Sequence, residues 1–225
     1  MAPLFLGAGE ARMNAVEKIF VLGLPRTGTT SVCVAALQLG LPTAHTAYTQ
    51  ACFEQAQVLA DTPCFSHYPE LARRYPLSRF ILLCRDEQAW LASIKQLLAR
   101  MSDNLLCTHG GFSPLLKQSY GRVFSPLNEQ TLANDEHLLH CYRRHQQQVR
   151  DYFATQSERL LCLNLGEPNA YHTFCRFLGV EPQGREFAHL NKGNKVMAWR
   201  DIKSPLKIAS TRNGKVDNLD SWWLG

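Results

Sequence analysis

The amino-acid sequence predicts an α/β protein in which a parallel sheet is flanked by helices on both faces, giving three layers. Apolar runs at residues 18–22, 79–84 and 159–164 are continuous rather than alternating, which is typical of strands covered on both faces. Segments with helical periodicity separate these runs, and parallel strands require such crossover connections. Together these observations favour a single domain spanning residues 1–225.

The first half of the chain supplies three predicted strands and two helices. The strands are expected at residues 18–22, 57–60 and 79–84. Residues 1–15 show no periodic pattern and are expected to form a loose extension. A helical pattern begins at Gly28 and ends at Gly40, and Pro42 blocks its continuation. The second helix follows the third strand, with Asp86 as its N-cap.

The second half begins with an irregular stretch. Residues 103–131 contain paired glycines and two prolines, so we expect a long loop with one short helix, of the kind that shapes a substrate pocket. A long helix at 132–156, a buried strand at 159–164 and a helix at 168–179 follow. The tail, residues 196–225, is expected to be irregular.

Composition limits the class of protein. Hydrophobic residues make up 45% of the chain, enough for a sizeable core, and the net charge of +5 suits an anionic ligand but not nucleic acid. The eight cysteines include no CxxC pair, so we expect reduced, buried thiols and no metal site. No apolar run approaches ~18 residues and no signal peptide is evident, so we expect a cytoplasmic protein without a membrane span.

The stretch after the first strand carries the functional prediction. It is a glycine-containing turn that leads into a helix whose first residues carry hydroxyl groups. Such a turn directs consecutive backbone N–H groups at one point, and the helix dipole adds positive potential there. Gly28 lets the backbone approach an oxygen-rich group closely. The predicted phosphate-binding loop consists of Pro25, Arg26, Thr27, Gly28, Thr29, Thr30 and Ser31.

The loop differs from the Walker A loop of kinases and nucleotidases. Gly23 and Gly28 have the spacing of GxxxxGK[ST], but Thr29 stands where the lysine should be, and the cation is Arg26 instead. A kinase needs that lysine together with Mg²⁺. A P-loop kinase of a small metabolite is therefore the first alternative function, and magnesium-dependent nucleotide binding would identify it.

The run at residues 25–31 resembles the 5′-phosphosulfate loop of sulfotransferases that use 3′-phosphoadenosine 5′-phosphosulfate (PAPS), which has the form P-[KR]-[ST]-G-T-[ST]. The resemblance runs from about Lys18 to Lys195 and implies a P-loop nucleotide-binding-like fold. It also implies transfer of a sulfuryl group from PAPS to a hydroxyl or amine, without a metal and with 3′,5′-adenosine bisphosphate as product. In that family the loop cation contacts the bridge between phosphate and sulfate, a role that would fall to Arg26, with residues 27–31 on the 5′-phosphate.

Two further elements of the family have counterparts here. The family binds the donor's 3′-phosphate with an arginine after a buried strand and a serine eight residues later, which would be Arg85 and Ser93. An arginine at the end of a strand can bind a phosphate with two hydrogen bonds, and an eight-residue step keeps Ser93 on about the same helix face. A late basic-glycine turn would close over the same phosphate, here Lys192 and Gly193.

The base that accepts the acceptor's proton stays open at this stage. Cytosolic family members place a His-x-Pro before the arginine motif, whereas this chain has Asp61 two residues before Pro63. A carboxylate can serve if its pKa is raised. The alternatives are His67, His45 and His109, because histidine needs less tuning.

The acceptor is expected to be a small molecule, a lipid or a sugar, as the resemblance implies. Its pocket is expected in the loops at residues 43–56 and 103–130, with His45, Tyr48 and Phe112 as candidate contacts. Because the family's histidine is missing, a non-catalytic nucleotide-binding module of the same fold is the second alternative. The sequence carries no signal for the oligomeric state.

Overall fold

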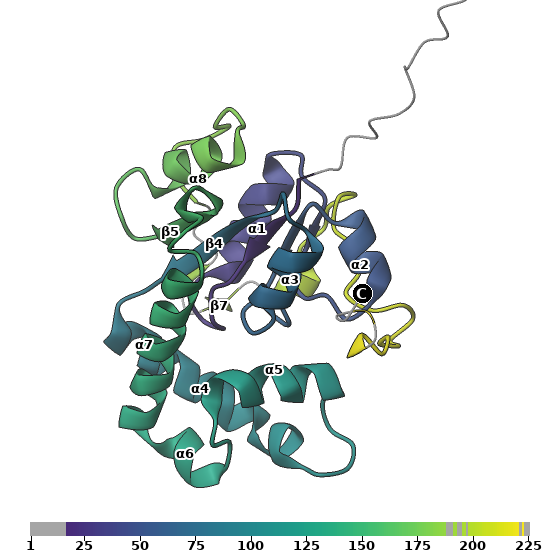
Figure 1. Ribbon diagram of the computed structural model, residues 1–225, viewed down its shortest axis with the longest axis vertical. Helices are drawn as coiled ribbons and strands as arrows, with labels where there is room; N and C mark the ends of the chain where they lie inside the picture. Colours follow the sequence, from purple (N-terminus) through teal and green to yellow (C-terminus); the bar gives the residue numbers. More distant parts are fainter. Residues whose placement is uncertain (1–16, 188–190, 193–194, 197, 221, 223–225) are drawn as a thin grey trace, which may run out of the picture.

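A five-stranded parallel sheet forms the middle layer of the protein (Figure 1). The computed structural model describes residues 17–187, 191–192, 195–196, 198–220 and 222, so the extension predicted at 1–15 lies outside the described residues. The strands are β1 Ile19–Val21, β2 Thr43–Ala44, β3 Val58–Ala60, β4 Arg79–Cys84 and β5 Leu160–Asn164. Their spatial order is β2-β3-β1-β4-β5, with every neighbouring pair parallel. The predicted α/β fold is confirmed.

Helices cover both faces of this sheet. They are α1 Thr29–Gln38, α2 Gln50–Gln55, α3 Tyr68–Arg74, α4 Glu87–Leu106, α5 Pro114–Phe124, α6 Glu129–Ala133, α7 Asp135–Tyr152 and α8 Ala170–Leu178. Ile19 and Val21 of β1 point to a core shared with α1 and α8, whereas Phe20 points to a core shared with α2, α3 and α7. Successive strand residues face opposite sides, so continuous apolar strands fill both cores.

A third core lies at one end of the sheet, where α4, α5 and α6 gather against α7 (Figure 1). Helix α4 begins where predicted, because the Asp86 side chain accepts a hydrogen bond from the N–H of Ala89 (2.8 Å). Trp90, Ile94 and Leu98 repeat at steps of four and are buried on one face of the helix. This packing holds α4 beside the carboxyl ends of the central strands.

Two predictions about the second half were wrong. Residues 103–131 are mostly helical, since α4 continues to Leu106 and α5 and α6 occupy much of the remainder. The apolar residues of these helices pack into the third core. The glycines and prolines between the helices made this helical spacing hard to recognise in the sequence. Strand β5 is not buried as predicted: it is the outermost strand, Leu163 is its one buried residue and Cys162 is exposed.

The described residues of the C-terminal segment form short elements and pack against the domain. It contains the two-residue strands β6 Asn191–Lys192 and β7 Lys195–Val196 and one 3₁₀ turn, Trp199–Asp201. Residues 206–208 run alongside β2, because the N–H of Thr43 donates to Leu206 O and its carbonyl accepts from Ile208 N. Trp222 stacks near Phe53, with 4.5 Å between ring centroids.

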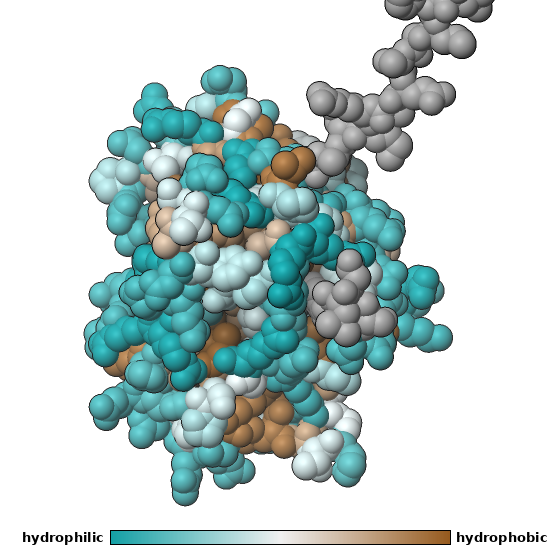
Figure 2. Space-filling view, in the orientation of Figure 1, coloured by the Kyte–Doolittle hydropathy of each residue, from teal (hydrophilic) through white to brown (hydrophobic). Residues whose placement is uncertain are grey.

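The surface of one face is mostly hydrophilic (Figure 2), and the cysteines differ in their exposure. Hydrophilic residues dominate the face drawn in Figure 2, with hydrophobic patches that include one over the α4–α5 end. None of the helices in the described part of the chain is long and apolar enough to cross a membrane. All eight cysteines are free, but Cys84 and Cys107 are only partly buried and Cys162 is exposed, so the prediction of uniformly buried thiols was wrong.

Candidate active site

The loop at residues 25–31 lies at the carboxyl end of β1, the central strand. The hydroxyl of Thr27 donates to Leu24 O (2.7 Å) and closes the turn, while the indole N–H of Trp90 donates to Pro25 O (3.1 Å) and ties the loop to α4. Arg26 has a φ of 74°, a conformation rare for residues other than glycine. Backbone strain of this kind often occurs at ligand-binding sites.

Gly28 is required by its backbone conformation and Gly23 by the side chains packed against it. Gly28 has a φ of 107°, and a Cβ placed on it would lie 2.5 Å from Leu165 Cδ1. A Cβ on Gly23 would lie 2.7 Å from Leu83 Cβ. Gly28 is also the N-cap of α1 and provides no side-chain acceptor for the first N–H groups of the helix. Those donors are available for an anion, and the helix dipole favours one there.

The structure brings Arg26, Arg85 and Ser93 together. The Arg26 Nε donates to Ser93 Oγ (2.8 Å), and the Arg85 Nη1 donates to Arg26 O (2.7 Å). The backbone of Arg85 is held by Tyr142, whose hydroxyl accepts from Arg85 N (2.8 Å) and donates to Arg85 O (2.9 Å). Two arginines from different strand ends therefore meet beside the N-terminus of α1.

A third arginine, which the sequence reasoning missed, belongs to the same group. Burial lowers the pKa of Arg26, and the guanidinium groups of Arg100 and Arg85 lower it further. Arg100 lies seven residues after Ser93 on α4, a step of two helical turns that keeps it on the same face. This seven-residue spacing is the feature of the sequence from which Arg100 could have been predicted. In the described part of the chain, Arg26, Arg85 and Arg100 form no ion pair with a carboxylate.

His45 follows β2 and contacts the hydroxyl groups at the start of α1. Its Nε2 lies 3.2 Å from Thr29 Oγ1 and 3.0 Å from Thr30 Oγ1. The imidazole stacks near Trp199, with ring centroids 5.5 Å apart. Burial lowers the pKa of His45 and Asp61 partly opposes this shift, so the neutral ring is favoured near pH 7.

Asp61 follows β3, the neighbour of β1, and has a φ of 61°. Its Oδ1 accepts from Thr62 N (2.7 Å) and Thr62 Oγ1 (3.3 Å), which fixes the orientation of the carboxylate. Burial raises the pKa of both Tyr48 and Tyr120, and the nearby charge of Asp61 raises it further. The charge of Asp61 therefore acts on two phenol groups, and Asp61 itself is partly buried.

The other predicted residues have different surroundings. His67 is fully buried, its Nδ1 lies 2.8 Å from Ser66 Oγ and its Nε2 lies 3.2 Å from Gln118 Oε1. Phe112 packs against the third core. The backbone of Lys192 forms the β6–β7 hairpin, whereas Gly193 lies outside the described residues.

Among the described residues, no three His, Cys, Asp or Glu side chains are grouped as metal ligands would be. The site instead consists of an uncapped helix N-terminus, three arginines, hydroxyl groups, a histidine and a carboxylate. These groups gather where the strands end on either side of β1, the usual place for ligands in open α/β sheets. The arrangement can bind a polyanion and accept a proton beside it.

Comparison with known proteins adds one match. A family model described as a sulfotransferase domain matches residues 18–49 and 44–196 of the chain. The matched ranges include the loop at residues 25–31, Asp61, Arg85 and Ser93. A search of curated proteins gives no match.

Proposed function

The chain belongs to the sulfotransferase family, and on that premise we propose that it transfers a sulfuryl group from PAPS to a hydroxyl or amine of a small-molecule, lipid or sugar acceptor. The observation that carries the choice of donor is the group of three arginines beside the uncapped start of α1, which have no carboxylate partner among the described residues. The three guanidinium groups repel one another when no anion is bound, and a bound polyanion offsets this repulsion.

PAPS carries anionic groups at both ends of its ribose, and the residues present fit both. We assign the 5′-phosphosulfate to the loop at residues 25–31, where backbone N–H groups and the hydroxyls of Thr29 and Thr30 supply donors. We assign the 3′-phosphate to Arg85 and Ser93, as in the family motif. Arg100 adds a third positive charge near Arg26. The Lys192–Gly193 turn remains a proposed contact of the 3′-phosphate.

The proposed reaction is an in-line displacement at sulfur. The acceptor oxygen forms a new S–O bond while the bond between sulfur and the bridging oxygen breaks, and 3′,5′-adenosine bisphosphate leaves with the electron pair. Arg26 stabilises the negative charge that develops on the leaving group. The acceptor's proton passes to a base, for which Asp61 is the first candidate, because one carboxylate oxygen is fixed by Thr62 and the other remains available.

His45 is the second candidate base. Its ring, which burial keeps neutral, lies within hydrogen-bonding distance of the α1 hydroxyls, so it can accept a proton or orient the sulfate. His67 is less suited, because it is buried and both ring nitrogens lie at hydrogen-bonding distance from other side chains. The eight free cysteines support a reducing compartment, and we propose the cytoplasm.

The first test is calorimetric titration with 3′,5′-adenosine bisphosphate, ATP and AMP in the presence of EDTA. The proposal expects tight, metal-independent binding of the bisphosphate and much weaker binding of AMP, which lacks the 3′-phosphate. Preference for ATP, or binding that requires Mg²⁺, would contradict the proposal and favour a kinase. Bisphosphate binding without sulfuryl transfer to any acceptor would indicate a non-catalytic module.

A further inference from the structure

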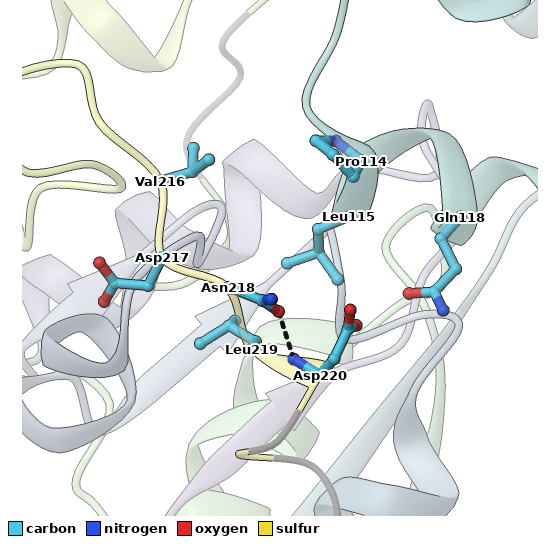
Figure 3. A pocket seen from close by; sticks show the side chains of 8 residues that line it. All are labelled: Pro114, Leu115, Gln118, Val216, Asp217, Asn218, Leu219 and Asp220. Atoms are coloured by element: carbon cyan, nitrogen blue, oxygen red, sulfur yellow. Dashed lines mark hydrogen bonds between the residues drawn. The ribbon is translucent and has the colours of Figure 1, made fainter. Parts of the chain in front are cut away.

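A cavity of about 420 Å³ lies between the start of α5 and the C-terminal segment (Figure 3). Its size is in the range of small-molecule sites. The residues that line it are Pro114, Leu115, Gln118, Val216, Asp217, Asn218, Leu219 and Asp220. The cavity is thus bounded by two segments that are about a hundred positions apart in the sequence.

The walls combine apolar surface with one free carboxylate. Figure 3 shows the Asp220 carboxylate pointing toward α5, between Leu115 and Gln118. The Asp217 carboxylate points the other way, and its Oδ2 accepts from Gln50 N (2.9 Å). Asp220 is exposed and forms no ion pair within the described part of the chain. No Lys or Arg side chain lines the cavity, and Asp217 lies 3.8 Å from the Arg212 guanidinium, so among the described residues Asp220 is the carboxylate of the cavity wall that has no cationic partner.

Contacts connect one wall to the loop that carries Asp61 and the other to Tyr48, whose neighbour Ala47 donates its N–H to Thr62 O of that loop (2.9 Å). On the tail side, Asp217 N donates to Tyr48 O (2.9 Å), and the Tyr48 phenol lies in the field of the Asp61 carboxylate. On the α5 side, Gln118 Oε1 lies 3.2 Å from the Nε2 of His67, a residue of the same loop as Asp61. The cavity therefore lies next to the acceptor side of the proposed active site.

We propose that this cavity holds the part of the acceptor remote from the reacting hydroxyl, and that the acceptor has an apolar body and a protonated amine; this inference rests on the proposed sulfotransferase function. Leu115 and Leu219 contact the apolar body, and Asp220 binds the ammonium group. The arginines at the donor end repel an ammonium group, so the two charges together orient the acceptor with its hydroxyl toward the donor.

The test uses three phenols that differ only at the end opposite the hydroxyl. Tyramine is cationic, 4-ethylphenol is neutral and 3-(4-hydroxyphenyl)propionate is anionic. Sulfuryl transfer from PAPS is measured for each phenol, along with binding to the protein saturated with 3′,5′-adenosine bisphosphate. We expect kcat/KM for tyramine to exceed that for 4-ethylphenol roughly three- to tenfold, the range of a partly exposed ion pair, and the anion to be poorest.

The variants are Asp220→Asn, Asp220→Lys and the control Asp151→Asn, which neutralises an exposed carboxylate on α7. Asp220→Asn should remove the preference for tyramine, Asp220→Lys should reverse it in favour of the anion, and the control should keep it. Affinity for the bisphosphate should stay unchanged in all three. If the preference survives Asp220→Asn, or if no amine binds the bisphosphate-saturated protein, the inference is overturned while the donor function stands.

Two other results have distinct meanings. If wild type fails to bind the bisphosphate, the proposed function itself fails, and the inference fails with it. If Asp220→Asn lowers the melting temperature but leaves the order of the three phenols unchanged, Asp220 serves to stabilise the start of α5 and does not bind the acceptor, which also overturns the inference.

Discussion

Replacing Arg100 with alanine tests the donor site most directly, because the residue lies outside the family motifs. Arg100 is exposed and has no carboxylate partner in the described part of the chain. For a guanidinium about 6 Å from a phosphate charge, Coulomb's law gives roughly 0.7 kcal/mol in bulk water and about 2.8 kcal/mol at an effective dielectric constant of ~20. Because Arg100 is exposed, the free energy that it contributes lies toward the low end of this range. We expect a loss of about 1 kcal/mol, or roughly fivefold in affinity for 3′,5′-adenosine bisphosphate.

The assay is calorimetric titration at low and high salt, with Lys95→Ala as the matched control. Lys95 lies on the same helix but pairs with Asp135 (2.5 Å), so its removal changes the net charge equally without touching the arginine group. The difference between Arg100→Ala and wild type should shrink at high salt, because exposed charges are screened over ~10 Å at ~0.1 M. The melting temperature of Arg100→Ala should not fall, since repulsion with Arg26 is relieved and alanine favours the helix. Equal affinity in Arg100→Ala and wild type, or an equal loss in Lys95→Ala, would refute the reasoning.

Three further predictions concern the base, the loop and acid stability. Asp61→Asn should lower turnover about 100-fold or more, the usual contribution of a general base, with unchanged bisphosphate affinity; an undiminished rate would transfer the role to His45. Gly28→Ala should destabilise the fold by about 1–3 kcal/mol and abolish donor binding, because of its positive φ and the contact with Leu165; urea denaturation and titration measure the two effects. Burial lowers the pKa of His145 to about 4, so between pH ~6.5 and ~4 the unfolded chain binds the extra proton. Stability should be full above pH ~6.5 and fall by up to ~1.4 kcal/mol per pH unit below it, and urea denaturation of His145→Gln should show a shallower decline.

The elements that the sequence predicted best are those in which local pattern and packing agree. The apolar run at 79–84 forms β4 with the predicted bounds, because a short continuous apolar run after a polar turn is typical of a buried strand. Asp86 caps α4 as predicted. The turn at Gly28 could also be predicted from the sequence, because a glycine before a helix that begins with hydroxyl residues is a local feature; in the structure Gly28 has a positive φ.

The remainder depended on tertiary structure that no local pattern reveals. Whether the run at 159–164 is buried depends on whether another strand pairs beyond it, and none does within the described residues. The seven-residue step from Ser93 to Arg100 is visible in the sequence, but the passage of α4 beside the loop, with Ser93 facing Arg26, is not. The cavity lined by Asp220 could not be predicted either, because it forms only where the tail returns across about 170 residues to place Asp217 beside Tyr48.

The pairing of residues 206–208 with β2 determines what a truncated chain would do. A sheet edge left open presents unpaired N–H and C=O groups and recruits other chains. A fragment that ends before residue 206 keeps every residue assigned to the donor, yet it uncovers the backbone of Thr43 and the Phe53 ring that Trp222 covers. Loss of the tail by proteolysis would therefore first produce self-association of the protein, before any loss of affinity for nucleotide.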